Sequence, residues 1–283
     1  HRSPNVRLGC TDCHGGNANA FTKQEAHVHP KECDAWPGSA NPVRSYTLLN
    51  HESPEFIRFV NPGDLRIAHP ITVPNAHVPA AEIVPALQGL VNAVVTAAEE
   101  ASAKAGRTIS CRKGCGACCR QLVPVSRSEG ERLIGVIEKL PADRRATLRQ
   151  RFAEAEMRIA AAGLDAPAGR SDRELSVAYF ALGVACPFLE DESCSIHPER
   201  PLVCREYLVT SPAELCAGPR QEGVTPVAVP KVSLAARQLQ DASDAWFPLA
   251  MLMAWGRRHP KGGKKRPGPD WVQRFLKGLA GKA

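Results

Sequence analysis

The nine residues from Cys111 to Cys119 read CRKGCGACC, and four of them are cysteines. Glycines at positions 114 and 116 permit the tight turns through which backbone amides approach a metal-bound sulfur. Adjacent side chains project in different directions, so Cys118 and Cys119 are not equivalent ligands for one ion. Either one of the pair lies outside the ligand set, or the pair serves two metal centres. The stretch predicts a thiolate metal site, and zinc and iron–sulfur both fit that ligand chemistry.

Four further cysteines follow at wider spacing: Cys186, Cys194, Cys204 and Cys216. A local turn combined with distant cysteines is typical of structural zinc and iron–sulfur sites. The alternative is a disulfide framework. A domain of about 200 residues with long amphipathic helices, however, buries enough apolar surface to fold without disulfides. The sequence therefore favours zinc, iron or an iron–sulfur cluster, held by the group from Cys111 to Cys204. Positive charge to offset the thiolates is expected from three neighbouring residues: Arg112, Lys113 and Arg120.

Helical patterns dominate from Pro79 onward. Apolar residues recur at helical spacing between Pro79 and Gly106. Ser128 and Glu131 form a capping-box signature that opens a helix over 128–140. The sequence thus predicts a compact, mainly α-helical domain built around the cysteine-ligated metal site.

Three more helices are expected further along the chain. An alanine-rich helix that begins at residue 142 is expected to stop at Gly163. A long helix is predicted over 232–255, with a kink or break at Pro248, and a short amphipathic helix over 271–281. Strand signals are confined to short runs such as VTPVAV at 224–229.

The first 69 residues differ from the rest, because they are rich in breakers and histidine and short in periodic apolar runs. They are predicted to form a loop-rich segment, with a soft domain boundary between Ile67 and Val78. Cys10, Cys13 and His14 form a CxxCH motif, the spacing of covalent haem c attachment. In that chemistry the thiols bind the haem vinyl groups and the imidazole binds the iron. A loop disulfide, or half of a zinc site beside a histidine, would give the same spacing.

The formal net charge of +7 is concentrated at the C-terminal end. Residues 256–283 contain nine Lys or Arg and a single acid, Asp270, so the rest of the chain is nearly neutral. Such a basic tail could contact nucleic acid or an anionic surface, but a solvated end is the simpler interpretation. The longest uninterrupted apolar run, 245–255, is too short to cross a bilayer, which needs about 20 residues, so no transmembrane segment is predicted. The predicted domains are 1–69 and 70–283.

The stretches CRKGCGACC, CPFL, CSI and ERPLVCREY together resemble the YkgJ-type cysteine-cluster family, the zinc- or iron-chelating CxxCxxCC domain. The resemblance extends loosely over residues 79–279. It implies a cytosolic metal-binding domain of unassigned biochemical role. By position it implies seven candidate ligands: Cys111, Cys115, Cys118, Cys119, Cys186, Cys194 and Cys204. Cys216 lies outside the closely matched motif and is a weaker candidate.

Two departures from the family pattern affect this ligand set. Three residues rather than two separate Cys111 from Cys115, so Cys111 need not bind the metal directly. His197 stands where the family usually shows an aromatic residue. The Cys194-x-x-His197 spacing allows a nitrogen ligand, although a partly exposed replacement is the simpler interpretation.

The N-terminal segment carries a second resemblance. LGCTDCHGG and the sequence WPGSANPVRSYTLLNHESPEFIRFVNPGDLRIA resemble the opening of large multihaem c-type cytochromes of environmental bacteria. No second CxxCH follows, so the resemblance implies a fragment with one haem, and Cys33 belongs to no haem motif. Four histidines are open as the second axial ligand: His27, His29, His51 and His69.

The sequence as a whole predicts a metal-binding cysteine-cluster protein that carries a haem-attachment fragment. Two alternatives stay open: haem-dependent electron transfer with a redox partner, and an iron–sulfur enzyme with redox or methyl-transfer chemistry. No acid–base or nucleophile motif supports an enzyme, so a non-catalytic role is expected. The compartments conflict, because a reduced cysteine cluster is a cytoplasmic feature whereas haem c is attached outside the cytoplasm. A natural fusion or a chimeric sequence would explain this conflict.

Overall fold

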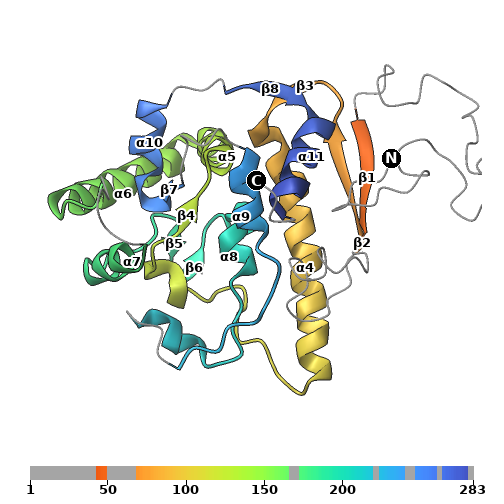
Figure 1. Ribbon diagram of the computed structural model, residues 1–283. Helices are drawn as coiled ribbons and strands as arrows, with labels where there is room; N and C mark the ends of the chain where they lie inside the picture. The colour runs from red at the N-terminus through yellow and green to blue at the C-terminus, as the bar shows by residue number, and fades with distance from the viewer. Residues whose placement is uncertain are drawn as a thin grey trace, which may run out of the picture. The chain divides into compact units, whose positions relative to one another are not determined.

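The computed structural model describes residues 43–49, 68–165, 172–218, 223–239, 246–259 and 263–279. Backbone contacts divide the chain into two units. Unit 1 consists of His1–Ala101, Ala228–Ser243 and Gly262–Ala283, and unit 2 of Ser102–Val227 and Asp244–Lys261. Figure 1 shows the elements of both units. The domain division at residue 69 was drawn from composition and stays a prediction.

Unit 1 opens with a pair of strands. β1 (Val43–Leu49) pairs antiparallel with β2 (Ala68–Pro74), and the register runs from Val43 opposite Pro74 to Leu49 opposite Ala68. Ile71 and Val73 lie on the same face of β2, and both are buried. β-branched residues are typical of the buried face of a strand. β1 lies within the segment expected to be loop-rich, and local periodicity does not predict it, because pairing with a later strand defines it.

The long helix α4 (Val84–Lys104) lies mostly in unit 1 and follows the 3₁₀ turn η2 (Ala80–Ile83). The predicted apolar stripe is its buried face: Leu87, Leu90, Val91 and Val94 are each at most 2% exposed. The prediction of a helix between Pro79 and Gly106 is therefore confirmed.

One segment is long and apolar enough to cross a membrane, judged by length and composition over the described residues: Ala80–Lys104. This segment contradicts the expectation drawn from uninterrupted apolar runs, because Gln88 and Asn92 interrupt its apolar sequence. A buried helix of a protein core meets the same two criteria, so this match to a membrane span is weak evidence.

The C-terminal end is structured over residues 263–279. β8 (Lys265–Pro267) pairs antiparallel with β3 (His77–Pro79), and α11 (Gly268–Leu279) packs on η2, β2 and α9 (Val232–Ala236). The apolar face of α11 is buried: Trp271, Val272, Phe275, Leu276 and Leu279. The predicted short amphipathic helix is confirmed. The basic side chains of Lys264, Lys265 and Lys277 are exposed, although the helix buries its apolar face within unit 1.

The four longest helices in the described part of unit 2 are α5 (Arg127–Glu138), α6 (Ala142–Ala161), α7 (Asp172–Ala181) and α10 (Leu252–Arg258). Phe152 of α6 meets Phe188 edge-to-face, with ring centroids 5.2 Å apart, in a buried apolar cluster that includes Leu133 and Leu252. The backbone turns after α6 at Gly163 (φ +64°), so the predicted end of this helix is confirmed. The mainly α-helical fold class is confirmed as well.

The start of α5 differs from the prediction. Ser126, not Ser128, caps the helix: its hydroxyl accepts from the Glu129 amide at 3.4 Å, while the Glu129 carboxylate accepts from the Ser126 amide at 3.0 Å. Two overlapping capping-box signatures occur in the sequence, one starting at each serine. The short strand β4 (Pro124–Val125) ends directly before Ser126, so the chain enters the helix at the first signature.

The long helix predicted over 232–255 is not continuous. α9 ends at Ala236 and passes into the 3₁₀ turn η6 (Arg237–Leu239). Beyond the gap in the described residues, β7 (Phe247–Pro248) pairs with β4, and η7 (Leu249–Met251) leads into α10. Pro248 interrupts the helical pattern because proline offers no amide hydrogen to a helix. The predicted strand at 224–229 reduces to one bridge, Val209 with Pro226.

Candidate metal centre

The segment from Cys111 to Cys119 turns back on itself in two steps. Gly114 has φ +87°, a backbone region that favours glycine, and the Cys115 amide donates to the carbonyl three residues earlier at 3.2 Å. The second step is the 3₁₀ turn η3 (Ala117–Arg120), which contains Cys118 and Cys119. The local turn predicted for these cysteines is therefore present.

A β-hairpin brings the second cysteine group to this turn. β5 (Leu189–Glu190) and β6 (Ser193–Cys194) pair antiparallel, and both residues between them have positive φ, as tight hairpin turns require. Directly before the hairpin, the Cys186 amide donates to the Cys119 carbonyl at 2.8 Å. This bond joins two cysteine segments that lie far apart in the sequence.

Gly116 makes this close approach possible. A Cβ atom at this position would stand 2.7 Å from Leu189 Cδ1 and 2.9 Å from the Glu192 carbonyl oxygen. Arg120 reinforces the contact with two hydrogen bonds to the Glu192 carboxylate, at 3.0 and 2.5 Å. This ion pair and the charge of Cys119 raise the pKa of Arg120, with Glu192 as the larger influence. The guanidinium thus serves mainly to hold the hairpin against the turn.

Cys204 lies on the short helix α8 (Leu202–Glu206), and a buried carboxylate fixes this helix. Glu129 is 3% exposed, and its Oε2 accepts from the amide and the hydroxyl of Ser126 at 3.0 and 2.7 Å. Its Oε1 accepts from the Leu202 amide at 2.9 Å. One carboxylate therefore caps both α5 and α8, and hydrogen bonds to an ionised acceptor are strong.

The loop between the hairpin and α8 is held by two arginines. The loop contains the 3₁₀ turn η4 (His197–Glu199), and Arg132 of α5 donates to both Glu199 carboxylate oxygens at 3.1 and 3.0 Å. Arg205 is 5% exposed and donates to the carbonyls of Arg200, at 3.0 Å, and Pro198. Cys194 and Cys204 are thus placed at the two ends of a clamped loop.

Four thiols form one electrostatic neighbourhood: Cys118, Cys186, Cys194 and Cys204. Burial, together with the charges of Cys194 and Cys118, raises the pKa of the Cys186 thiol to about 12. Burial also raises the pKa of Cys204 well above its ordinary value, and the charges of the other three thiols add to the effect. The pKa of Cys194 is raised by burial and by Cys118. Every pair among the four therefore interacts.

Cys118 belongs to a second neighbourhood as well, with Cys111, Cys115 and Cys216. Burial, followed by the charges of Cys118 and Cys115, raises the pKa of Cys111. Burial and the charges of Cys118 and Cys111 raise the pKa of Cys216. A hydrogen bond with the Cys119 thiol, followed by burial, raises the pKa of Cys118 itself. Cys118 is thus the thiol common to both neighbourhoods.

Arg200 is the cation that acts on thiols of both groups. Its charge lowers the pKa of Cys111, Cys118 and Cys194 against the opposing effect of burial. Its Nη1 also donates to His197 Nε2 at 2.7 Å, and since a guanidinium has only donors, this imidazole nitrogen is the acceptor. His197 Nε2 is therefore already occupied, so a nitrogen ligand at this position would have to be Nδ1.

Cys216 is buried on the 3₁₀ turn η5 (Ala213–Ala217). The Gln121 amide group holds this turn by donating to the carbonyls of Cys216 and Gly218 at 3.0 and 2.9 Å. The hydroxyl of Tyr207 is buried with no hydrogen bond of normal geometry in the part of the chain that the structure describes. The hydroxyl still lies near enough to Cys216 to lower the pKa of that thiol. A buried hydroxyl group thus lies next to the neighbourhood of Cys118, Cys111, Cys115 and Cys216.

The eight cysteines of the described ranges all have free thiols, so no disulfide framework joins them there. No three His, Cys, Asp or Glu side chains, among the residues that the structure describes, stand at the spacing of ligands around one ion. The eight described thiols therefore form a group, but no three of them stand at ligand distance from one common ion position. The donor set nonetheless fits a thiophilic cation, because such an ion displaces the thiol protons and binds the sulfur atoms directly. Cys10, Cys13, His14 and Cys33 lie outside the described residues.

Sequence reasoning missed three residues of this site. Arg200 was overlooked in favour of Arg112 and Lys113, because closeness in sequence was taken as closeness in space. Glu129 carried a signal, the overlapping capping box, but nothing in the sequence connects it to α8. Tyr207 ends the ERPLVCREY stretch, but nothing in the sequence places its hydroxyl beside Cys216.

Comparison with known proteins identifies one family. Residues 110–221, less than half of the chain, match the family model CxxCxxCC, described as "Putative zinc- or iron-chelating domain". Neither the curated proteins nor the solved structures contain a significant match to this chain. No comparison returned a cytochrome, so haem attachment at Cys10, Cys13 and His14 has no support beyond the motif itself.

Proposed function

We propose that unit 2 binds zinc or iron through thiolates, and that Cys118, Cys186, Cys194 and Cys204 hold the principal ion. The observation that carries this proposal is the neighbourhood of these four thiols, in which each pair interacts. The chelating-domain match over residues 110–221 supports the same chemistry. Four thiolates are the usual ligand set of structural zinc and of iron–sulfur clusters.

The protein contributes position and charge compensation to this site. Gly116 and the Cys186–Cys119 backbone bond bring the turn to the hairpin, and Glu129 orients the helix that carries Cys204. Arg200 offsets part of the thiolate charge. Since these thiols have raised pKa values, they are protonated at neutral pH without metal, and an ion that binds them releases protons.

The remaining thiols support a second, adjacent metal position. Cys111, Cys115 and Cys216 share a neighbourhood with Cys118, and Cys119 is hydrogen-bonded to Cys118. In this arrangement the Cys118–Cys119 pair serves two centres, one of the two alternatives that the sequence left open. The number of metal ions per chain distinguishes these two alternatives, because one zinc ion per chain requires only the principal site.

The role that follows is structural or metal-handling rather than catalytic. An ion shared by Cys118 and Cys186 closes a loop of roughly 70 residues, and closing such a loop removes several kcal/mol of entropy from the unfolded chain. An iron–sulfur cluster at this position would add one-electron chemistry when bound. We place this domain in the cytoplasm, because the proposed ligands must stay reduced.

The test is metal analysis of the full chain purified without oxygen. Mass spectrometry of the metals and the visible spectrum identify the ion, because zinc is colourless and iron–sulfur clusters absorb broadly. The variant Cys118→Ser should lose most of the bound metal. Cys33→Ser makes the same chemical change outside residues 110–221, the range that matches the chelating domain, and should keep it.

Two results would contradict the proposal. Parent protein that contains neither zinc nor iron after reconstitution with each would exclude the site. Metal loss that is equal in Cys118→Ser and Cys33→Ser would show that binding does not depend on this group of thiols.

A further inference from the structure

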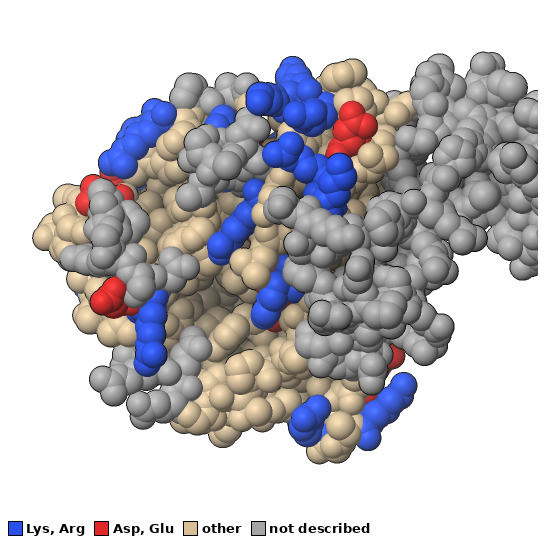
Figure 2. All heavy atoms as spheres, in the orientation of Figure 1, with Lys and Arg blue, Asp and Glu red and all other residues tan. Residues whose placement is uncertain are grey.

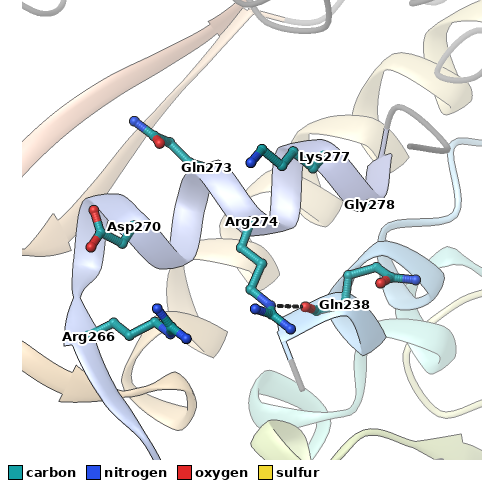
Figure 3. Close-up of a pocket in the computed structure, with 7 residues that line it drawn as sticks. All are labelled: Gln238, Arg266, Asp270, Gln273, Arg274, Lys277 and Gly278. Atoms are coloured by element: carbon teal, nitrogen blue, oxygen red, sulfur yellow. Dashed lines mark hydrogen bonds between the residues drawn. The ribbon is translucent and has the colours of Figure 1, made fainter. Parts of the chain in front are cut away.

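Unit 1 contains a cavity of about 430 Å³ that the proposed metal function does not use. It lies between α11, β8 and η6, and Figure 3 shows the side chains that line it. Six of them are polar: Gln238, Arg266, Asp270, Gln273, Arg274 and Lys277. Known small-molecule sites range from about 300 to 1,000 Å³, so the cavity has the size for a small ligand.

The frame of this cavity is fixed by packing and pairing. Arg266 is the central residue of β8 and lies opposite Val78 in the β3–β8 ladder. The Trp271 indole nitrogen of α11 donates to the Val78 carbonyl at 2.8 Å, which ties helix and strands together. Close packing at Gly278 brings the far end of α11 against Gln238, because a Cβ atom there would stand 2.5 Å from Gln238 Cγ. The polar groups are therefore presented on rigid elements.

Two guanidinium groups enter the same space from different elements. In Figure 3 the side chains of Arg266 and Arg274 extend from β8 and α11 toward the gap beside Gln238. Arg274 Nε donates to the Gln238 carbonyl at 2.5 Å, and the Arg266 guanidinium lies 5.5 Å from the Trp271 ring centroid. The buried Nε of Arg266 has no hydrogen-bond partner among the described residues. Two guanidinium groups thus line the same cavity.

The charge of the lining is unbalanced. Arg266, Arg274 and Lys277 contribute three positive charges, and Asp270 is the single acid among the lining residues in the described ranges. Lysine and arginine side chains gather over β8 and α11 on the face shown in Figure 2, so the surrounding potential is also positive. Like charges held together repel, and an anion in the cavity relieves that repulsion.

We propose that this cavity binds a small soluble molecule that carries a phosphate or pyrophosphate group. Guanidinium groups match phosphate oxygens with paired hydrogen bonds, and Gln238 and Gln273 add amide donors. The lining contains no apolar side chain among the described residues, which disfavours fatty acids and other largely apolar anions. The volume exceeds that of one phosphate, so the ligand is expected to carry a further polar part.

The test is calorimetric titration of the full chain with inorganic pyrophosphate at about 0.15 M salt, where distant surface charges are screened. Parent protein should bind with a dissociation constant below about 1 mM, and Arg274→Gln should weaken binding about tenfold or more. Lys265→Gln removes the same charge from an exposed position on β8 that does not line the cavity. This control should stay within about twofold of the parent.

Lys277→Gln guards against a folding defect in Arg274→Gln, because Arg274 also bonds to the chain at Gln238. It should weaken pyrophosphate binding severalfold without changing the melting temperature. No heat of binding with the parent would overturn the proposal, as would equal weakening by Lys277→Gln and Lys265→Gln.

Two further ligands test which kind of anion the cavity prefers. Citrate offers carboxylates, and a short single-stranded RNA offers phosphates on a polymer. Weaker binding of both than of pyrophosphate supports the proposal. Citrate binding as tight as pyrophosphate would overturn the phosphate assignment, and tighter binding of RNA would overturn the small-molecule assignment.

Discussion

Different interactions stabilise each of the two units of this protein. Unit 1 buries long apolar faces, such as those of α4 and α11, and its described residues contain no cysteine. Unit 2 contains all eight described cysteines, and the part around them consists of turns, a two-residue hairpin and a five-residue helix. Hydrophobic burial stabilises unit 1 and the helices of unit 2, whereas the short elements around the cysteines bury too little surface to be stable by themselves. The comparison predicts that metal stabilises unit 2 and has little influence on unit 1.

The largest effect is expected from Cys118→Ser, because Cys118 belongs to both thiol neighbourhoods. Metal binding contributes folding free energy directly, so its loss should cost several kcal/mol and lower the Tm of unit 2 by about 10 °C or more. Scanning calorimetry with metal analysis measures both. Cys216→Ser should have a smaller effect. A single transition that shifts as a whole would show that the units do not differ in their dependence on metal.

Leu87→Ala should produce the reverse pattern. Leu87 is fully buried in α4, and removing such a side chain from a packed core costs about 2–5 kcal/mol. The transition of unit 1 should fall while the metal content stays at the parental value. Metal loss in this variant would break the proposed division between the units.

Glu129→Gln should destabilise unit 2 by about 1–3 kcal/mol, because the new amide group places donors against the donors of Ser126 or Leu202. Metal affinity should fall as α8 loosens. The matched control is Glu138→Gln, in an exposed ion pair with Arg149, which should change stability by less than about 1 kcal/mol. Urea unfolding measures both, and equal effects would contradict the double cap.

Gly116→Ala should have the smallest effect of the four, about 1 kcal/mol, since the hairpin can shift to admit one methyl group. It should also lower metal affinity, because the shift separates Cys186 from the turn. Gly135→Ala is the matched control: its Cβ atom would meet nothing within 4 Å, and alanine favours a helix, so stability should rise slightly. Titration with zinc in competition with a chelator measures the affinity of each variant. Unchanged affinity in Gly116→Ala would show that the close approach does not shape the site.

Much of the fold was predictable where local patterns decide. The apolar stripe predicted α4, and the amphipathic pattern after Trp271 predicted α11. Prediction failed where two overlapping local signals compete, or where an element depends on a distant segment. The overlapping capping boxes gave the wrong first residue for α5, and β1 was missed because β2 defines it.

The sequence by itself determined that cysteines gather around Cys111–Cys119, that glycines shape this turn, and that helices surround it. Spacing within a few residues fixes such features, because the chain cannot separate its neighbours. Only the tertiary structure decided that Cys118 is shared by both thiol groups, that Arg200 supplies the nearby charge, and that Glu129 caps a second helix. These relations join residues up to about 100 positions apart, and packing of whole elements, not local preference, brings such residues together.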